Sequence, residues 1–184
     1  MSLRIIKLLP KILIMPRQNH IYSLETLFKM TSDLKKRGKK VAFTHGAFDL
    51  FHIGHLDLLN RSSRIADFLI VGIENNANVS SYKTNHKAII DENDRVEVIN
   101  ALNCVDATFI NPYQVSIETY VYLYKNLFAD YITIGPNFAS PQYVHIQAHH
   151  SGSQVLTLGY ERLASTSQII DSIIKQAGIS NPSS

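Results

Sequence analysis

The spacing of apolar positions alternates along the chain between a helical and an extended pattern. Between residues 23 and 36 these positions recur every three or four residues, with Ser23 in place to cap a helix and Gly38 in place to end it. Short runs rich in Val, Ile and Phe separate such stretches and favour buried strands. The pattern predicts helices at 23–36, 55–64, 91–102, 117–127, 143–150 and 165–175, and strands at 40–44, 67–74, 107–110, 131–134 and 154–158.

Strands that alternate with helices of these lengths indicate an α/β fold. We expect a Rossmann-like, doubly wound parallel sheet of about five strands, in a single domain because the chain has 184 residues. The domain should occupy residues 21–178, after a flexible extension at 1–20 and before a tail at 179–184. Ligands of such sheets bind beyond the carboxyl ends of the strands. The segments that follow residues 44, 74, 134 and 158 should therefore surround one site.

Two histidines and two glycines mark the turn after the first expected strand. The turn reads Thr44-His45-Gly46-Ala47-Phe48-Asp49-Leu50-Phe51-His52-Ile53-Gly54-His55. Gly46 permits a tight turn, and the helix that begins near His52 and His55 offers unpaired N–H groups to an anion. Transfer of a nucleotidyl group builds negative charge around the α-phosphate, which such donors stabilise. One histidine alone would be better explained as a cap or a packed side chain, but the paired spacing favours phosphate binding.

This turn resembles the signature Gly-x-Phe-Asp-x-x-His-x-Gly-His of the cytidylyltransferase-like nucleotidyltransferases, with matches at Gly46, Phe48, Asp49, His52, Gly54 and His55. The resemblance implies an enzyme that joins a nucleoside monophosphate from an NTP to a small phosphorylated substrate and releases pyrophosphate. It implies that Mg²⁺ accompanies the NTP and that His52 and His55 stabilise the charged transition state. It also implies a nucleotide site that includes Thr44, Gly46, Ala47, Phe48, His52, Gly54, His55 and Gly135.

A hydroxyl-rich stretch, Ser165-Thr166-Ser167, stands at the start of the last expected helix. From the residues alone, a plain N-cap explains such a stretch better than a ligand site does. The stretch also resembles the second motif of the same family, which holds the triphosphate at the start of the last helix. The resemblance implies that Ser165, Thr166 and Ser167 bind the β- and γ-phosphates.

A narrower resemblance, to adenylyltransferases that act on heptose 1-phosphate, suggests the acceptor. The segment 75–87 resembles their lysine-bearing segment, which implies that Lys83 is catalytic and that Lys83 and Lys87 bind the acceptor. Two solvated loop lysines are the alternative explanation. Asp49 should orient a substrate or a histidine. Arg95 matches an arginine of the family's middle helix, although a structural salt bridge explains it equally well.

Other positions depart from the heptose enzymes and leave two alternatives open. His45 and Ala47 stand where those enzymes usually have Asn and Cys, and Pro136-Asn137-Phe138 replaces Gly-Asp-Tyr. One alternative is a cytidylyltransferase that acts on a polyol or lipid-head phosphate, such as glycerol 3-phosphate. The other belongs to a different class, a non-catalytic nucleotide-binding module.

Charge and composition argue against other partners. The formal net charge is only +3, and the one dense basic cluster, residues 35–40, is best explained as a solvated helix end, so no nucleic-acid partner is expected. The basic, apolar stretch 1–15 is interrupted and too short to cross a bilayer, so no membrane partner is expected. Cys104 is the only cysteine, which suits a reducing compartment and a cytoplasmic location.

Two further groups of polar and aromatic side chains have weaker interpretations. One expected helix carries three histidines, without a further ligand in register, so no metal site is expected: His145, His149 and His150. Another expected helix and its end carry aromatic residues that suit packing or a dimer face, which leaves a homodimer open: Tyr120, Tyr122, Tyr124 and Phe128.

Overall fold

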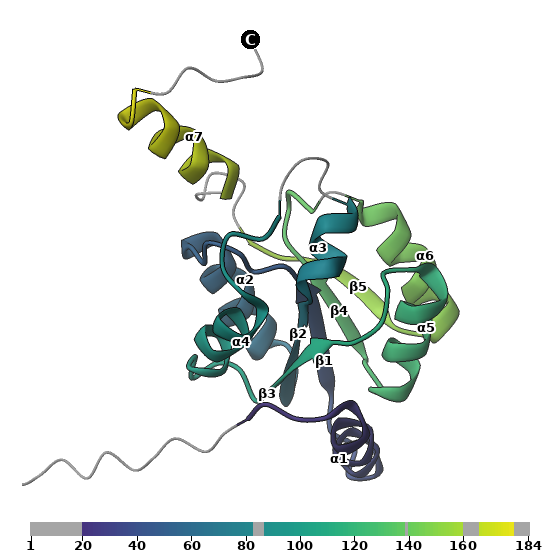
Figure 1. Ribbon diagram of the computed structural model, residues 1–184. Helices are drawn as coiled ribbons and strands as arrows, with labels where there is room; N and C mark the ends of the chain where they lie inside the picture. The colour runs from purple at the N-terminus through teal and green to yellow at the C-terminus, as the bar shows by residue number, and fades with distance from the viewer. Residues whose placement is uncertain (1–19, 83–86, 139, 160–165, 179–184) are drawn as a thin grey trace, which may run out of the picture.

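The computed structural model describes residues 20–82, 87–138, 140–159 and 166–178 of the chain. Five parallel strands form one sheet in the order β3-β2-β1-β4-β5 (Figure 1). The strands are β1 (Val41–Gly46), β2 (Phe68–Glu74), β3 (Ala107–Asn111), β4 (Tyr131–Ile134) and β5 (Gln154–Thr157). The predicted Rossmann-like parallel sheet is confirmed. Its strand order reverses between β1 and β4, so a ligand site is expected beyond their carboxyl ends.

Helices connect the strands at nearly the predicted positions. They are α1 (Leu24–Lys36), α2 (Ile53–Arg64), α3 (Asn76–Tyr82), α4 (Glu92–Asn100), α5 (Ile117–Asn126), α6 (Pro141–Ser151) and α7 (Thr166–Gln176). Ser23 caps α1 as predicted, because its hydroxyl accepts from the Thr26 amide at 3.2 Å. The hydrophobic spacing did not predict α3, because Val79 is the one buried apolar residue among its described side chains and gives no periodic signal. A side chain caps the start of α3, where Oδ1 of Asn75 accepts from the backbone amide of Asn78 at 2.8 Å.

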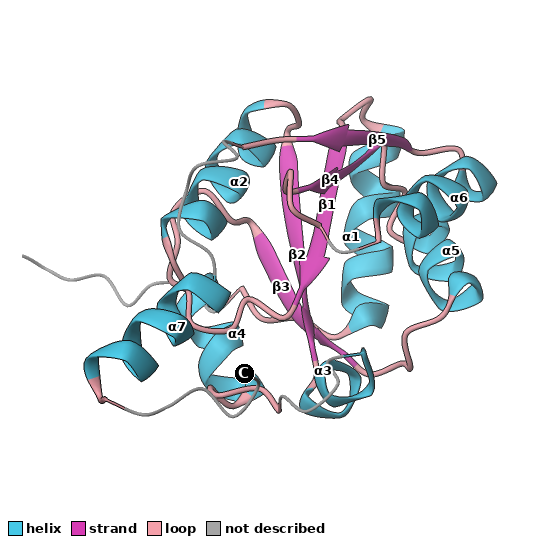
Figure 2. Cartoon of the chain, turned by 90° about the horizontal axis from the view of Figure 1, so that it is seen from above, coloured by secondary structure: helices cyan, strands magenta, loops and turns pink. Residues whose placement is uncertain are grey.

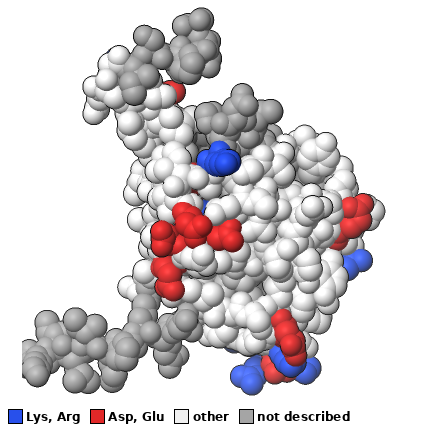
Figure 3. Space-filling model, in the orientation of Figure 1, with Lys and Arg blue, Asp and Glu red and all other residues white. Residues whose placement is uncertain are grey.

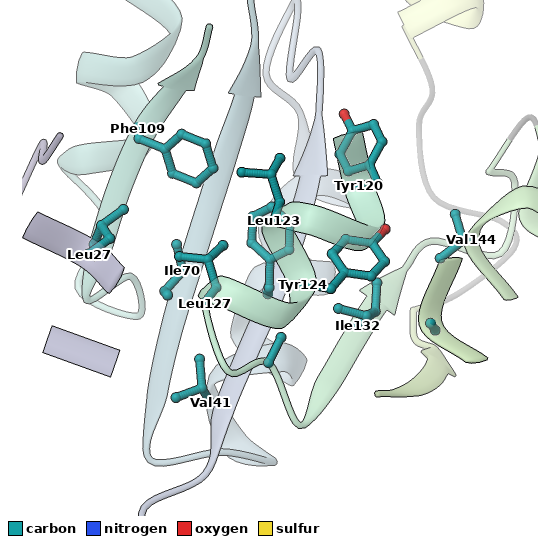
Figure 4. Packing of buried hydrophobic residues seen from close by; sticks show 14 of the residues in the cluster. Leu27, Val41, Ile70, Phe109, Tyr120, Leu123, Tyr124, Leu127, Ile132 and Val144 are labelled. Atoms are coloured by element: carbon teal, nitrogen blue, oxygen red, sulfur yellow. The ribbon is translucent and has the colours of Figure 1, made fainter. Parts of the chain in front are cut away.

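Helices cover both faces of the sheet (Figure 2). On one face α1, α5 and α6 pack over the larger core, which includes Phe43 and Ile132. On the other face α2 and α4 pack over Ala42 and Val71. Successive residues of β1 thus point to opposite faces, as the pleat requires. Figure 4 shows how α5 fills the larger core with side chains one turn apart, among them Tyr120 and Tyr124.

The basic cluster of residues 35–40 lies where α1 leads into β1, and ion pairs hold most of it. Asp130 accepts from Lys35 at 2.6 Å and from Lys40 at 2.9 Å, while Lys39 reaches Asp67 at 2.9 Å. Asp130 also accepts from the backbone amide of Val41 at 3.0 Å. Residues 35–40 are all exposed, as expected of a solvated helix end, and these ion pairs also link the start of β1 to the neighbouring turns that carry Asp67 and Asp130.

Gly72 in the middle of β2 offers a test of the core. A Cβ atom added there would lie 3.0 Å from the Phe43 ring and 3.1 Å from the Phe109 ring, which stack on each other at a centroid distance of 5.9 Å. Gly72→Ala should lower the free energy of unfolding by about 1–3 kcal/mol, because both rings are buried and must shift to admit the added methyl group. Urea unfolding measures this change. Gly135→Ala, which meets no atom within 4 Å, is the matched control and should change stability by less than about 0.5 kcal/mol. Equal effects of the two substitutions would contradict the packing argument.

Candidate active site

The turn between β1 and α2 has an unusual backbone. Phe48 and Leu50 adopt φ angles of +50° and +44°, a region that residues other than glycine rarely enter. The turn ends at His52, which caps α2 with an extended backbone and an Nδ1 atom that accepts from the Gly54 amide at 3.1 Å. Strained turns of this kind persist where the surroundings over-determine them, and they concentrate at functional sites.

His52 and His55 lie together at the start of α2. Their rings stack at a centroid distance of 3.8 Å and an angle of 20°. Phe48 and Phe51 pack against His55, at centroid distances of 5.3 and 5.6 Å. Burial lowers the pKa of the His52 imidazole below its ordinary value of 6.5, so this ring is neutral near pH 7. Since Nδ1 of His52 accepts a hydrogen bond, its proton resides on Nε2, which is the atom free to donate to a phosphate oxygen.

Asp49 has a different role from the one expected. Its side chain is buried, and its carboxylate accepts from the backbone amides of Ile89 at 2.9 Å and of Leu50 and Ile90 at 3.0 Å. From the sequence we expected this carboxylate to orient a substrate or a histidine. The structure instead uses it to hold the segment before α4 against the turn after β1.

Arg95 is the largest fully buried side chain among the described residues and binds three segments at once. Its Nε donates to the carbonyl of Ile90 at 2.9 Å, and its terminal nitrogens donate to the carbonyl of Ala47 and, at 2.8 Å, to Oδ1 of Asn76. Because a guanidinium presents several donors in a rigid plane, one side chain can fix the turn after β1, the segment before α4 and the start of α3. Arg95 thus has a structural role, but these three acceptors are neutral carbonyl and amide oxygens rather than the carboxylate of the expected salt bridge.

A hydrogen bond joins the two motifs of the sequence. The hydroxyl of Thr166, the first residue of α7, donates to the backbone carbonyl of Asp49 at 3.2 Å. The hydroxyl-rich helix start therefore lies beside the turn that carries the histidine pair, although 117 residues separate the two bonded residues. Ser167 is exposed next to it, and Ser165 lies outside the described residues.

The remaining predicted residues have varied positions. Thr44 is buried, and its hydroxyl donates to the Thr133 carbonyl at 2.9 Å, so this side chain ties β1 to β4 rather than facing a ligand. Gly135 follows β4 with open space where a Cβ would be. Lys87 is exposed near the segment that Asp49 holds, and Lys83 lies outside the described residues.

A buried polar network at the strand ends was not predicted. The carboxylate of Glu74, the last residue of β2, accepts from the hydroxyl of Tyr120 and from Asn78 at 2.9 Å, and lies 3.5 Å from Nδ1 of His45. Nε2 of His45 in turn lies 2.9 Å from the Tyr124 hydroxyl. Burial, with the charge of Glu74 adding to it, raises the pKa of Tyr124 far above its ordinary value. The available signal was a polar residue near the end of two apolar strands, His45 in β1 and Glu74 in β2.

In the described part of the chain, no group of three or more His, Cys, Asp or Glu side chains is arranged to hold a metal ion. His145, His149 and His150 are exposed on α6. Among the helices of the described residues, none has the length and apolar character needed to cross a bilayer.

Comparison with known proteins gives the family. Residues 43–172 match the family model described as Cytidylyltransferase-like. The chain belongs to this family. The family is one of nucleotidyltransferases, and its matched region includes both motifs and every strand of the sheet from Phe43 onward.

Relatives of the cytidylyltransferase-like chain include two proteins named "Bifunctional protein HldE". The one from Geobacter metallireducens is 30% identical over 159 residues, which cover 86% of this chain and 32% of that protein. The one from Helicobacter hepaticus is 32% identical over 158 residues, which cover 85% of this chain and 30% of that protein. The chain thus spans about a third of the length of these curated relatives. A crystal structure of a lipopolysaccharide core biosynthesis protein from Thermoplasma volcanium has the same fold, with a TM-score of 0.57, 22% identity, and coverage of 67% of this chain and 100% of that one.

The Asp49 carboxylate can be tested by removing one of its acceptor oxygens. Asp49→Asn turns an amide N–H₂ toward a backbone N–H, so the variant should lose about 1–3 kcal/mol of unfolding free energy. Asp57→Asn is the comparison variant, because Asp57 forms a partly exposed pair with Arg61 one turn along α2, at 2.8 Å, and its loss should cost about 1 kcal/mol or less. Chemical denaturation measures both. A loss for Asp49→Asn no larger than the control would contradict the assigned role.

The His52 assignment predicts a pH dependence. Because the pKa of His52 is lower in the folded chain, the unfolded chain binds a proton at this residue more readily than the folded chain does. The contribution of His52 to stability is therefore fully present above about pH 6.5 and decreases as the pH falls. His52→Asn keeps a capping side chain and removes the titration. This variant should lose less stability than the unchanged protein between about pH 7.5 and pH 5. His52→Ala should show the same weaker pH dependence at a lower overall stability, because it lacks the cap. Identical pH dependence in all three proteins would contradict the assignment.

Proposed function

We propose that the chain transfers the adenylyl group of ATP to a small sugar phosphate, such as heptose 1-phosphate, and releases pyrophosphate. The observation that supports this most is the hydrogen bond from Thr166 to Asp49, because it brings the triphosphate motif beside the histidine pair. The narrower resemblance to heptose 1-phosphate adenylyltransferases supports the choice of nucleotide and acceptor. A reaction that consumes an NTP also agrees with the cytoplasmic location expected from the sequence.

The proposed reaction is a direct in-line displacement. An oxygen of the acceptor phosphate forms a bond to the α-phosphorus of ATP, while the bond from that phosphorus to the bridging oxygen breaks and pyrophosphate leaves. A phosphate monoester is largely a dianion near pH 7, because its second pKa is about 6, so the reaction requires no strong general base. The protein contributes position and charge stabilisation.

Each part of the site has a role in this proposal. Nε2 of His52 and the imidazole of His55 would donate to oxygens around the α-phosphate, at the positive end of α2. The start of α7, with Thr166 and Ser167, would hold the β- and γ-phosphates. Lys83 and Lys87 would bind the acceptor phosphate and neutralise the charge shared by the two substrates. Gly46, Ala47, Phe48 and Gly135 would border the nucleotide.

Magnesium is proposed to arrive with the nucleotide. Mg²⁺ is commonly held by substrate phosphates and one or two carboxylates. The Asp49 carboxylate is buried and already accepts from three backbone amides, so it is a poor ligand for the ion. The ion would accordingly be held mainly by the triphosphate and water, and would neutralise charge on the departing pyrophosphate.

Pyrophosphate release tests the reaction and its substrates together. The chain should release pyrophosphate with ATP and a sugar 1-phosphate, and release should stop when EDTA removes Mg²⁺. Each of the four NTPs should be paired with heptose 1-phosphate and glycerol 3-phosphate. Faster release with CTP and glycerol 3-phosphate would show the cytidylyltransferase alternative to be correct. Thermal stabilisation by nucleotides without release, across the panel, would support a non-catalytic binding module.

The histidine pair can be tested in the same assay. His55→Ala should reduce kcat by about 100- to 1000-fold, the usual effect of removing a transition-state donor. His145→Ala, an exposed histidine on α6, is the matched control and should leave kcat unchanged. The thermal midpoint of both variants shows whether the fold persists. A folded His55→Ala variant with full activity would exclude the proposed role of this imidazole.

A further inference from the structure

Aromatic rings surround the imidazole of His45 at the carboxyl end of β1. This imidazole stacks on the ring of Tyr120 at a centroid distance of 4.0 Å and an angle of 27°, and on the ring of Phe43 at 5.6 Å. The ring of Tyr124 is tilted toward it at 6.1 Å, and the ring of Phe138 meets it nearly at a right angle at 5.9 Å. Aromatic rings attract a cation that lies within about 6 Å of them. This enclosure therefore favours an imidazole that carries a positive charge.

The directions of the hydrogen bonds around His45 place a proton on its Nε2 atom. The carbonyl of Ser116 can only accept, so the side-chain nitrogen of Gln147 donates to it, at 3.5 Å. The side-chain oxygen of Gln147 therefore faces the Tyr124 hydroxyl, which donates to it at 3.3 Å. Because this hydroxyl has a single hydrogen, its oxygen accepts from Nε2 of His45, at 2.9 Å. Nε2 is thus a donor and carries a proton.

The other ring nitrogen of His45 faces the carboxylate of Glu74. Nδ1 lies 3.5 Å from Oε1 of Glu74, and the two side chains are only 7% and 4% exposed. The carboxylate also accepts from the hydroxyl of Tyr120 and from the side-chain nitrogens of Asn78, at 2.9 Å, and Asn111, at 3.3 Å. Donors aimed at a carboxylate favour its charged form, and a buried negative charge requires an opposite charge close to it. Within the described parts of the chain, His45 is the one basic side chain that pairs with this carboxylate.

We propose that His45 is an imidazolium and forms a buried ion pair with Glu74. Its Nδ1 donates to the carboxylate, while its Nε2 donates to Tyr124. Ion pairs at the surface are screened by water and contribute little to stability. Figure 3 shows the charged side chains of one face in small, separate groups at the surface, whereas the pair of His45 and Glu74 lies inside the molecule. Loss of one partner would leave the other as a buried charge without compensation, which is strongly destabilising.

The ion pair holds His45 where it supports both sides of the candidate site. His45 directly precedes Gly46, the last residue of β1, from which the turn with the histidine pair starts. Phe138, whose ring rests against His45, belongs to the segment that follows β4. Since ligands of this fold bind between these two strands, His45 is a positioning residue that acts through the turn and through Phe138. This role rests on the nucleotide site proposed above, whereas the ion pair itself does not.

Nitrogen-15 NMR of the imidazole rings tests the charge of His45 directly. At about pH 7.5 both ring nitrogens of His45 should show the chemical shifts of protonated nitrogens, whereas His52 should show one protonated and one unprotonated nitrogen. Through-bond correlations to the backbone assign the signals. Glu74→Gln removes the negative charge, so His45 should then keep the proton on Nε2 and lose the one on Nδ1. An unprotonated Nδ1 in the unchanged protein, or unaltered His45 signals in Glu74→Gln, would overturn the ion pair.

Unfolding measurements on paired variants test the coupling between the two side chains. His45→Asn should raise the unfolding equilibrium constant by about 100-fold or more, because Glu74 then remains as a buried charge. Glu74→Gln should raise it less, because an imidazole can release a proton. The double variant buries no charge, so its loss should be smaller than the two single losses combined. His145→Asn, at an exposed position of α6, is the matched control and should unfold like the unchanged protein. Single losses that simply add in the double variant would contradict the ion pair.

The affinity for ATP tests the positioning role. Glu74→Gln and Phe138→Ala should each weaken ATP binding several-fold, measured by calorimetry below the thermal midpoint of each variant. The two changes together should weaken it no more than the larger single effect, because both act through the His45 ring. His145→Asn should bind ATP like the unchanged protein. Effects that multiply, or single variants with unaltered affinity, would exclude the positioning role. An unchanged protein that binds no nucleotide would contradict the proposed function as well, and the NMR result would still decide the ion pair.

Discussion

Two buried charged side chains, Asp49 and Arg95, hold the segments around the candidate site in place through hydrogen bonds to backbone atoms. Asp49 accepts from three amides, and Arg95 donates to two carbonyls and to the amide oxygen of Asn76. Such charge-assisted bonds are strong in a buried setting, and a missing partner leaves a costly unpaired group. The positive φ angles of Phe48 and Leu50 are tolerable because these bonds leave the turn no alternative.

Most of the fold could be predicted from the sequence, because the spacing of apolar residues indicates which side of each helix or strand is buried. Ser23 capped its helix as predicted, and all five strands ended within two residues of their predicted ends. The helix α3 was not predicted because Val79 is the one buried apolar residue among its described side chains, and because the helix begins with an asparagine cap. Hydrophobic spacing cannot detect a helix that is stabilised mainly by polar contacts.

The sequence predicted which segments form the candidate site better than it predicted the directions of their side chains. The motifs correctly indicated which turn and which helix start lie together. They did not show that Thr44 and Asp49 point into the protein, because sequence gives the type of a side chain and not its direction. The network of Glu74, His45 and Tyr124 was missed for a related reason, since its members come from three separate elements.

The bond between Thr166 and Asp49 has a consequence for how a triphosphate would be received. A threonine hydroxyl has a single hydrogen, and here that hydrogen is given to a carbonyl oxygen. Phosphate oxygens only accept, so an arriving nucleotide competes for the same hydrogen. The net contribution of this hydroxyl to nucleotide binding is then the difference in free energy between its bond to a phosphate oxygen and its bond to the Asp49 carbonyl. Once released, the carbonyl of Asp49 must accept from another donor. Occupancy at one helix start would in this way be transmitted to the backbone of a turn more than a hundred residues away in sequence.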